Sequence, residues 1–206
     1  MASISENLNF YEVMAVLVPG TVLLLGLAFL TGIVAAPANL AEATVGAFGF
    51  FLIGAYVTGF LLQTLAAIVE KVYWAVWKGR PTDWVRLGEG RLLSQEQEQV
   101  LLSRTGFSTP SEQQWHAAYG LWTTQVRASV PENRLQRFLG NYGLARGIVA
   151  AALALGVAHL WLNGFAWSDS LGLLLGASAL GLWRMHTSAI DYARELFRCY
   201  LSIPSK

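Results

Sequence analysis

The chain has 206 residues, of which 54% are hydrophobic and only 13% are charged. Soluble domains carry about 25% charged residues, so this composition excludes an ordinary water-soluble globular protein. The formal net charge of +1 gives no general attraction to nucleic acid, and we do not expect direct nucleic-acid binding.

The first apolar segment is predicted to begin as a helix that lies in the membrane interface. Apolar residues recur at three- and four-residue steps from Ile4 to Val18, which is typical of a one-sided helix. Pro19-Gly20 should then interrupt this helix, because proline removes a hydrogen-bond donor and clashes with the preceding turn. We expect a spanning segment from Pro19 to Ala36. Pro19 and Gly20 form either a gating hinge or a simple join between an interfacial and a spanning helix.

The second apolar segment runs from Thr44 to Val69 and contains no charged residue. A run of about 18 or more such residues is long enough to cross a hydrocarbon core of roughly 30 Å. Small residues let neighbouring helix backbones approach closely in lipid. The glycines expected to serve this purpose, in this segment and in the last one, are Gly46, Gly54, Gly59, Gly172 and Gly176.

A polar insert separates the apolar segments. The stretch from Glu70 to Arg146 holds ten of the fourteen Lys and Arg residues. A capping box at Ser94 predicts a short helix that ends at Gly106. The string Thr109-Pro110-Ser111-Glu112 predicts the start of a second helix. A third helix should open at Pro131 and continue without a break into the membrane.

Two further spans are predicted after the insert. The third is Gly147 to Leu162, and the fourth begins near Ser170, with an apolar part that ends at Trp183. The charged residues beyond Trp183 either anchor the helix at the inner membrane interface or surround a pore. These residues are Arg184, His186, Arg194 and Arg198.

Together the segments predict an all-α membrane protein with four transmembrane helices. The helices form two hairpins, joined by a helical cytosolic insert between spans 2 and 3. The expected domains are an interfacial helix with hairpin 1 (residues 1–77), a cytosolic module (78–143), and hairpin 2 with a cytosolic C-terminal helix (144–206). The short loops Pro37–Ala43 and Asn163–Asp169 lack Lys and Arg. The positive-inside rule therefore predicts that the insert and both termini are cytoplasmic.

The sequence contains no motif that indicates catalysis. His116, His159 and His186 are dispersed, and the usual phosphate-loop, hydrolase and zinc-protease signatures are missing. We therefore expect no enzyme activity, metal or cofactor. Arginines of the insert either bind the anionic groups of a nucleotide or partner protein, or form a solvated surface near anionic lipid. They are Arg86, Arg91, Arg127, Arg134 and Arg137.

Four short strings are spread over most of the chain. They are Leu17-Val18-Pro19-Gly20, Ala55-Tyr56-Val57-Thr58-Gly59, Gly79-Arg80-Pro81-Thr82 and Tyr192-Ala193-Arg194-Glu195-Leu196. This combination resembles small four-span bacterial proteins encoded in anti-phage operons. That group includes membrane effectors of cyclic-nucleotide signalling systems and membrane subunits such as that of Kiwa. The resemblance implies a bacterial inner-membrane oligomer whose cytosolic part receives a signal and whose spans disturb the membrane.

Two functions fit these observations. The first is a defence effector or sensor, in which a homo-oligomer packs through glycine-rich faces and the insert binds a nucleotide second messenger or a partner protein. Ligand binding would bias the spans between two packings. The second is a non-conducting, membrane-anchored scaffold for a soluble partner protein. A lipid-modifying enzyme is a third option. The resemblance favours the first.

Overall fold

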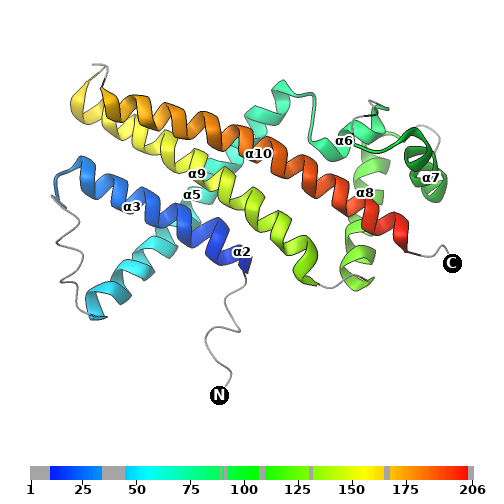
Figure 1. The fold of residues 1–206 in the computed structure, drawn as a ribbon, viewed down its shortest axis with the longest axis horizontal. Coiled ribbons are helices and arrows are strands. Elements are labelled where there is room, and N and C mark those ends of the chain that lie inside the picture. The colour runs from blue at the N-terminus through cyan, green and yellow to red at the C-terminus, as the bar shows by residue number, and fades with distance from the viewer. Residues whose placement is uncertain are drawn as a thin grey trace. The chain divides into compact units, whose positions relative to one another are not determined.

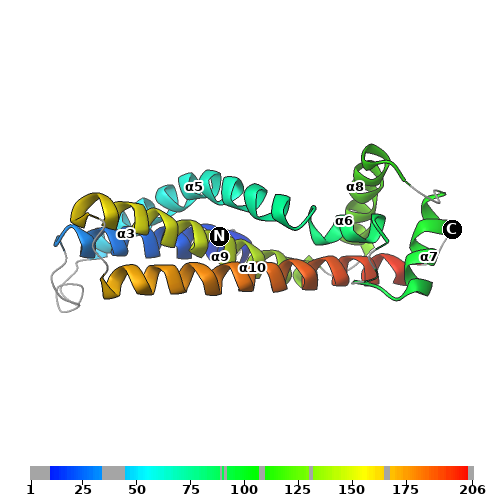
Figure 2. The same cartoon turned by 90° about the horizontal axis from the view of Figure 1, so that it is seen from above.

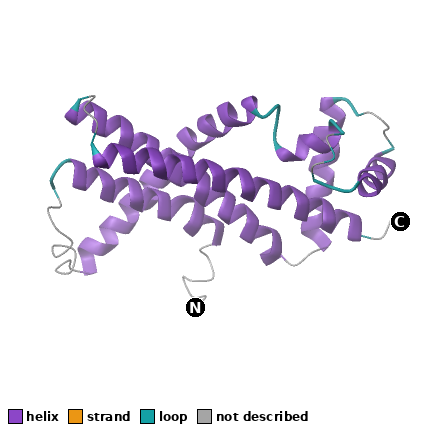
Figure 3. Cartoon of the chain, turned by 45° about the horizontal axis from the view of Figure 1, so that its top comes forward, coloured by secondary structure: helices purple, strands orange, loops and turns teal. Residues whose placement is uncertain are grey.

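The computed structural model describes residues 10–33, 45–88, 90, 92–106, 110–129, 132–164 and 168–203. Every regular element in these ranges is helical, which confirms the predicted all-α class for the described part (Figure 3). The predicted loop Pro37–Ala43 and Arg91 lie outside the described residues. Figure 1 labels the α-helices, which are α2 (Phe10–Glu12), α3 (Val18–Leu30), α5 (Val45–Val76), α6 (Pro81–Arg86), α7 (Gln95–Thr105), α8 (Glu112–Ser129), α9 (Glu132–Asn163) and α10 (Asp169–Ser202). A π-helical turn, η1 (Val13–Leu17), joins α2 to α3.

The chain divides into two compact units. Unit 1 comprises Met1–Lys71 and Gly140–Met185, and unit 2 comprises Val72–Leu139 and His186–Lys206. The domain boundaries expected after residues 77 and 143 lie a few residues from these divisions. Residues 186–206 share a unit with the insert, whereas the expected domains grouped them with hairpin 2.

Among the described residues, three helical segments are long and apolar enough to cross a membrane. They are Val13–Leu30, Val45–Arg86 and Leu135–Asn163. Many of their large apolar side chains lie on the surface of the chain, including those of Phe60 and Val157. An apolar surface of this kind suits contact with lipid rather than with water. The first part of α10 is not among these three segments, so the fourth span stays a prediction.

The first helix does not break at Pro19-Gly20, contrary to the prediction. Helical backbone continues from Phe10 to Leu30, and the register changes just before the proline. The Val18 N–H donates to the Val13 carbonyl, five residues back, as in a π-helix. Proline is therefore accommodated by a local change of register. A hinge role for Pro19 and Gly20 stays a prediction.

Small side chains set the packing of unit 1. Leu62 and Ala66 of α5 form a buried cluster with Ala150 and Ala151 of α9, and Leu23 packs against it. The parts of α9 and α10 in this unit run side by side (Figures 1 and 2). These helices combine an alanine-rich interior with apolar outer faces, which is the pattern of membrane helices that associate through close packing.

Unit 2 is organised around an aromatic core. Trp115 and Trp122 of α8 pack edge to face, with ring centroids 5.0 Å apart. Trp122 also packs against Phe197 and Tyr200 of α10, at 5.9 and 5.4 Å. Contacts of this kind contribute beyond simple burial of area. They join the C-terminal part of α10 to the insert.

The termini of the unit 2 helices follow their predicted caps. The Ser94 side chain accepts the Gln97 N–H, the Gln97 side chain accepts the Ser94 N–H, and Gly106 ends α7 with a φ of 71°. At the far end of α10, the Arg104 guanidinium donates to the carbonyl of Tyr200 at 3.1 Å and to that of Ile203 at 2.9 Å. The Tyr200 carbonyl also accepts the Ile203 N–H at 3.2 Å, and the arginine adds a side-chain donor at this helix end.

Candidate functional site

The candidate site of unit 1 begins at a carbonyl that proline leaves without its usual donor. In an α-helix the carbonyl of Ala15 would accept the N–H of residue 19, four positions later. Residue 19 is proline and has no N–H. Ala15 lies inside the π-helical turn, and its side chain is fully buried. Its carbonyl cannot receive the hydrogen bond that residue 19 would donate in an α-helix, and it can accept one from another helix.

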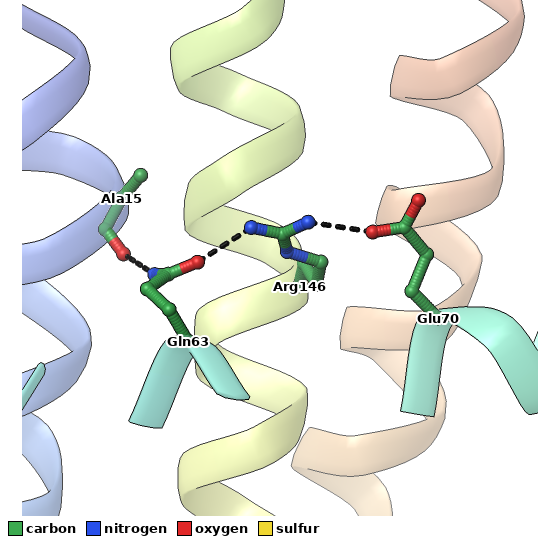
Figure 4. Close-up of polar contacts among 4 residues, drawn as sticks. All are labelled: Ala15, Gln63, Glu70 and Arg146. Atoms are coloured by element: carbon green, nitrogen blue, oxygen red, sulfur yellow. Dashed lines mark hydrogen bonds and ion pairs between the residues drawn. The ribbon is translucent and has the colours of Figure 1, made fainter. Parts of the chain in front are cut away.

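Gln63 of α5 supplies that hydrogen bond (Figure 4). Its Nε2 group donates to the Ala15 carbonyl, and its Oε1 atom accepts a hydrogen bond from Nη2 of Arg146 in α9. The two bonds use opposite ends of one amide, which fixes its orientation. Gln63 thus links the first helix to the third candidate span.

Arg146 continues the chain of polar contacts to Glu70. Its Nη1 atom lies 2.5 Å from Oε2 of Glu70, and the two side chains are only 17% and 7% exposed. Glu70 follows Gln63 by seven residues, or two turns, so both side chains lie on the same face of α5. The Arg146 guanidinium also lies over the ring of Tyr142, 6.0 Å from its centroid. We call the set Ala15, Gln63, Glu70 and Arg146 the polar chain.

The electrostatics make the polar chain sensitive to the loss of any charged member. Two buried opposite charges compensate each other, and breaking such a pair by removing one partner typically costs about 3–5 kcal/mol. The Nε atom of Arg146 is buried without a hydrogen-bond partner among the described residues. The state in which Glu70 and Arg146 are paired is therefore more stable than states in which the two charges are separated.

Backbone contacts hold the helices of the polar chain at short distance. A Cβ atom at Gly20 would lie 1.9 Å from the Ala55 carbonyl oxygen, and one at Gly59 would lie 2.0 Å from that of Val16. A Cβ atom at Gly143 would come within 2.6 Å of the Ala15 Cβ. A side chain at any of these three glycines would clash with the facing helix. They bring η1, α3, α5 and α9 close enough for Gln63 and Arg146 to reach their partners.

The glycines expected to pack helices have different surroundings. Gly59 is in the backbone contact just described, and a Cβ at Gly54 would make ordinary contact with Leu24 at 3.5 Å. A Cβ at Gly176 would meet nothing within 4 Å among the described residues. Gly46 is exposed and Gly172 is partly exposed. Packing of these outer glycines against another subunit stays a prediction.

The arginines expected to contact a ligand do not form one cluster in the described part of unit 2. Arg86 is half-buried, and its Nε atom lacks a hydrogen-bond partner. Arg127 and Arg137 are exposed. The side chain of Arg134, like Arg91, lies outside the described residues.

Arg127 lies in an environment that sequence reasoning did not anticipate. Burial of the Tyr119 phenol, together with its hydrogen bond to Tyr192, raises the pKa of Tyr119. The guanidinium charges of Arg80 and Arg127 oppose that rise in the Tyr119 pKa. Two cationic groups therefore face a pair of phenols on α8 and α10, an arrangement whose donors suit an anionic group.

The charged residues expected near the inner interface are also dispersed. Arg184 and Arg198 are exposed, and Arg194 lies 3.8 Å from Asp191, one turn away on the same helix. An exposed pair of this kind contributes little to stability. His186 instead lies among aromatic rings of unit 2.

A separate cluster surrounds His159 near the end of α9. Asn163 Nδ2 donates to the His159 carbonyl and lies 3.3 Å from His159 Nδ1. His159 Nε2 lies 2.9 Å from Ser168 Oγ, which accepts the Leu171 N–H. Ser168 therefore caps the start of α10.

Sequence reasoning missed the polar chain, although part of the signal was present. Gln63 and Glu70 are the polar residues of one α5 face at a seven-residue spacing, next to an uncharged run. Arg146 immediately precedes the uncharged run of the third span. Assigning Glu70 and Arg146 to the insert concealed that they could pair. In the part of the chain that the structure describes, no group of three or more His, Cys, Asp or Glu could hold a metal ion.

Comparisons of the chain with protein-family models, with curated proteins and with solved structures give no match.

Proposed function

We propose that this chain is an inner-membrane component of a bacterial anti-phage defence system. In this proposal it forms a homo-oligomer that disrupts the membrane, or senses a signal there, under the control of its cytosolic module. The four short strings described above support the defence assignment through their resemblance to small four-span proteins of such systems. The physical support for a controlled membrane device comes from the polar chain.

The proposed topology has four spans in two hairpins with both termini in the cytoplasm. The apolar part of α10, Leu171 to Trp183, would be the fourth span, in addition to the three long apolar helices. The connecting loops that would face outward contain no Lys or Arg, which supports this orientation. Unit 2, with the insert and the last part of α10, would then be the cytosolic module.

The polar chain is the observation that carries the proposal. A membrane effector needs a resting packing that holds firmly and a second packing that becomes favourable when a signal arrives. Arg146 and Glu70 stabilise one packing of the helices only while they stay paired. Ionisable residues within membrane regions are costly and commonly functional. A shift of α9 relative to α5 would separate the pair and let both charges reach water or lipid headgroups.

Leakage from dye-loaded liposomes tests this proposal. We expect the wild-type protein to release dye only when one of a panel of cyclic nucleotides is added. Arg146→Gln removes the ion pair with the Glu70 carboxylate, so it should release dye without nucleotide, at least about tenfold faster than wild type, which corresponds to about 1.4 kcal/mol. Lys71→Gln is the matched control, since Lys71 is an exposed cation next to Glu70, and it should behave like wild type.

Helical circular dichroism and protease accessibility would establish that each variant is folded and inserted. If neither the wild type nor Arg146→Gln releases dye under any condition, the effector proposal is overturned. That result would favour the non-conducting scaffold, for which the aromatic core of unit 2 offers a stable platform for a soluble partner protein.

A further inference from the structure

Unit 2 contains a histidine enclosed by four aromatic rings. The centroids of Trp77, Trp74, Trp84 and Tyr73 lie 4.6, 5.5, 5.9 and 6.0 Å from that of His186. Trp74 stacks on the imidazole at an interplanar angle of 25°, whereas Tyr73 meets it nearly edge-on at 79°. The rings come from α5, from the turn that follows it and from α6, and the imidazole comes from α10. We call this set the aromatic cage.

The cage supplies one polar partner to the imidazole. The Tyr73 hydroxyl lies 3.1 Å from Nδ1 of His186, so neutral Nδ1 can accept the hydroxyl proton. No carboxylate among the described residues lies within 4.0 Å of the ring nitrogens. The charged residues nearest along the packed elements are Lys78 after α5, Asp83 and Arg86 in α6, and Arg184 and Asp191 in α10.

We propose that the aromatic cage is a proton-responsive latch. Neutral His186 holds the end of α5, α6 and the last part of α10 together, and protonation of Nδ1 releases them. Protonated Nδ1 becomes a donor, so the Tyr73 hydroxyl must turn from donor to acceptor and the contact must rearrange. The resulting cation has no acidic partner among the described residues and lies among aromatic rings. The latch would let a fall in cytosolic pH loosen the module.

The direction of the response follows from two opposing effects. Burial disfavours the charged imidazole and lowers the pKa of His186. Aromatic faces attract a cation, which acts in the opposite direction. With its pKa lowered by burial, His186 is mainly neutral at neutral pH. Release then begins only as the pH falls below the ordinary histidine value of about 6.5.

Nuclear magnetic resonance of the full chain in lipid nanodiscs tests the latch. Histidine labelled at Cε1 and tryptophan labelled at Nε1 would be followed from about pH 8 to about pH 5, which brackets the ordinary titration of histidine. Loss of one signal in His186→Gln assigns His186, and single Trp→Phe variants assign the indoles. We expect a His186 midpoint below about 6.5. The indole signals of Trp74, Trp77 and Trp84 should move with that same midpoint.

Two variants make the result decisive. His116→Gln removes an exposed histidine of α8 and should leave the indole titration unchanged, whereas His186→Gln should abolish it. Tyr73→Phe removes the donor to neutral Nδ1 and should raise the midpoint. A His186 midpoint at or above about 6.5 would overturn the latch. Indole signals that do not shift with the His186 midpoint, or that still shift with pH in His186→Gln, would also overturn it. The measurement needs no leakage and is independent of the defence proposal.

Discussion

Two buried carboxylates in this chain are in opposite electrostatic situations. Glu70 is 5% exposed and pairs with Arg146. Glu98 in α7 is 9% exposed, and its Oε1 atom has no hydrogen-bond partner among the described residues. Burial raises the pKa of Glu98. A residue of the first kind ties helices together, whereas a residue of the second kind lowers stability when it is charged.

The replacement Glu98→Gln tests this difference. Because the folded-state pKa of Glu98 is raised, the wild type gains stability as the pH falls through that pKa toward about 4.5, the ordinary value, and loses it as the pH rises. Glu98→Gln should remove this slope and stabilise unit 2 at pH 7 by roughly 1 kcal/mol, because it removes the buried negative charge that burial disfavours. Thermal unfolding in micelles at about pH 5 and pH 7 measures both effects.

Glu96→Gln is the matched control, because Glu96 is exposed on the same helix. It should unfold like wild type at both pH values. A Glu98→Gln protein that is less stable than wild type at pH 7 would contradict the interpretation.

At the scale of elements, the contact between η1 and α5 depends on the absence of side chains. Gly59 of α5 faces the Val16 carbonyl, and Gly20 of α3 faces the Ala55 carbonyl. Each glycine lowers intrinsic helix stability by roughly 1 kcal/mol relative to alanine. That cost is offset by the close approach, which lets Gln63 reach the Ala15 carbonyl.

Gly59→Ala should separate these helices and weaken the polar chain. The added methyl would lie 2.0 Å from the Val16 carbonyl oxygen, which is backbone and cannot move alone. We expect a loss of about 3 kcal/mol, as for severe overpacking. Gly49→Ala in the same helix meets nothing within 4 Å among the described residues and should be neutral or stabilising. Unfolding midpoints in micelles compare the two variants, and equal midpoints would refute the role of the close contact.

The elements were predictable where a local rule decides their ends. Ser94 with Gln97 and Gly106 bounded α7 correctly, because caps act within a few residues. The predicted interruption of the helix at Pro19 was wrong because the rule considers only the backbone N–H donor that proline lacks. It does not anticipate that Gln63, distant in sequence, satisfies the carbonyl left free. The pairing of Arg146 with Glu70 was missed for a similar reason, since it depends on the register between α5 and α9.

At the scale of the whole molecule, the outer face of α10 in unit 1 is apolar and open. Leu173 and Leu180 are 75% and 65% exposed, and a Cβ at Gly176 would meet nothing within 4 Å among the described residues. A small residue between exposed leucines suits close approach by another membrane helix. We proposed that the chain forms a homo-oligomer, and this face is where we expect copies to meet.

Gly176→Leu should weaken self-association without unfolding the chain. A bulky side chain would hold two such faces apart, and we expect at least a tenfold weaker association, or about 1.4 kcal/mol. Cross-linking and light scattering in micelles would report the change, and Gly49→Leu in α5 serves as a control substitution on another helix. Unchanged association in Gly176→Leu, together with unchanged unfolding, would exclude this face as the contact.

The polar chain also bears on the biogenesis of the protein. When the first span leaves the ribosome, Pro19 cannot serve the Ala15 carbonyl, and Gln63 and Arg146 have not yet been synthesised. An unsatisfied carbonyl is costly in hydrocarbon. The first span should therefore remain near the translocon or the headgroup layer until the second and third spans are inserted. This helix would reach its final position only after the two spans that follow it in the chain.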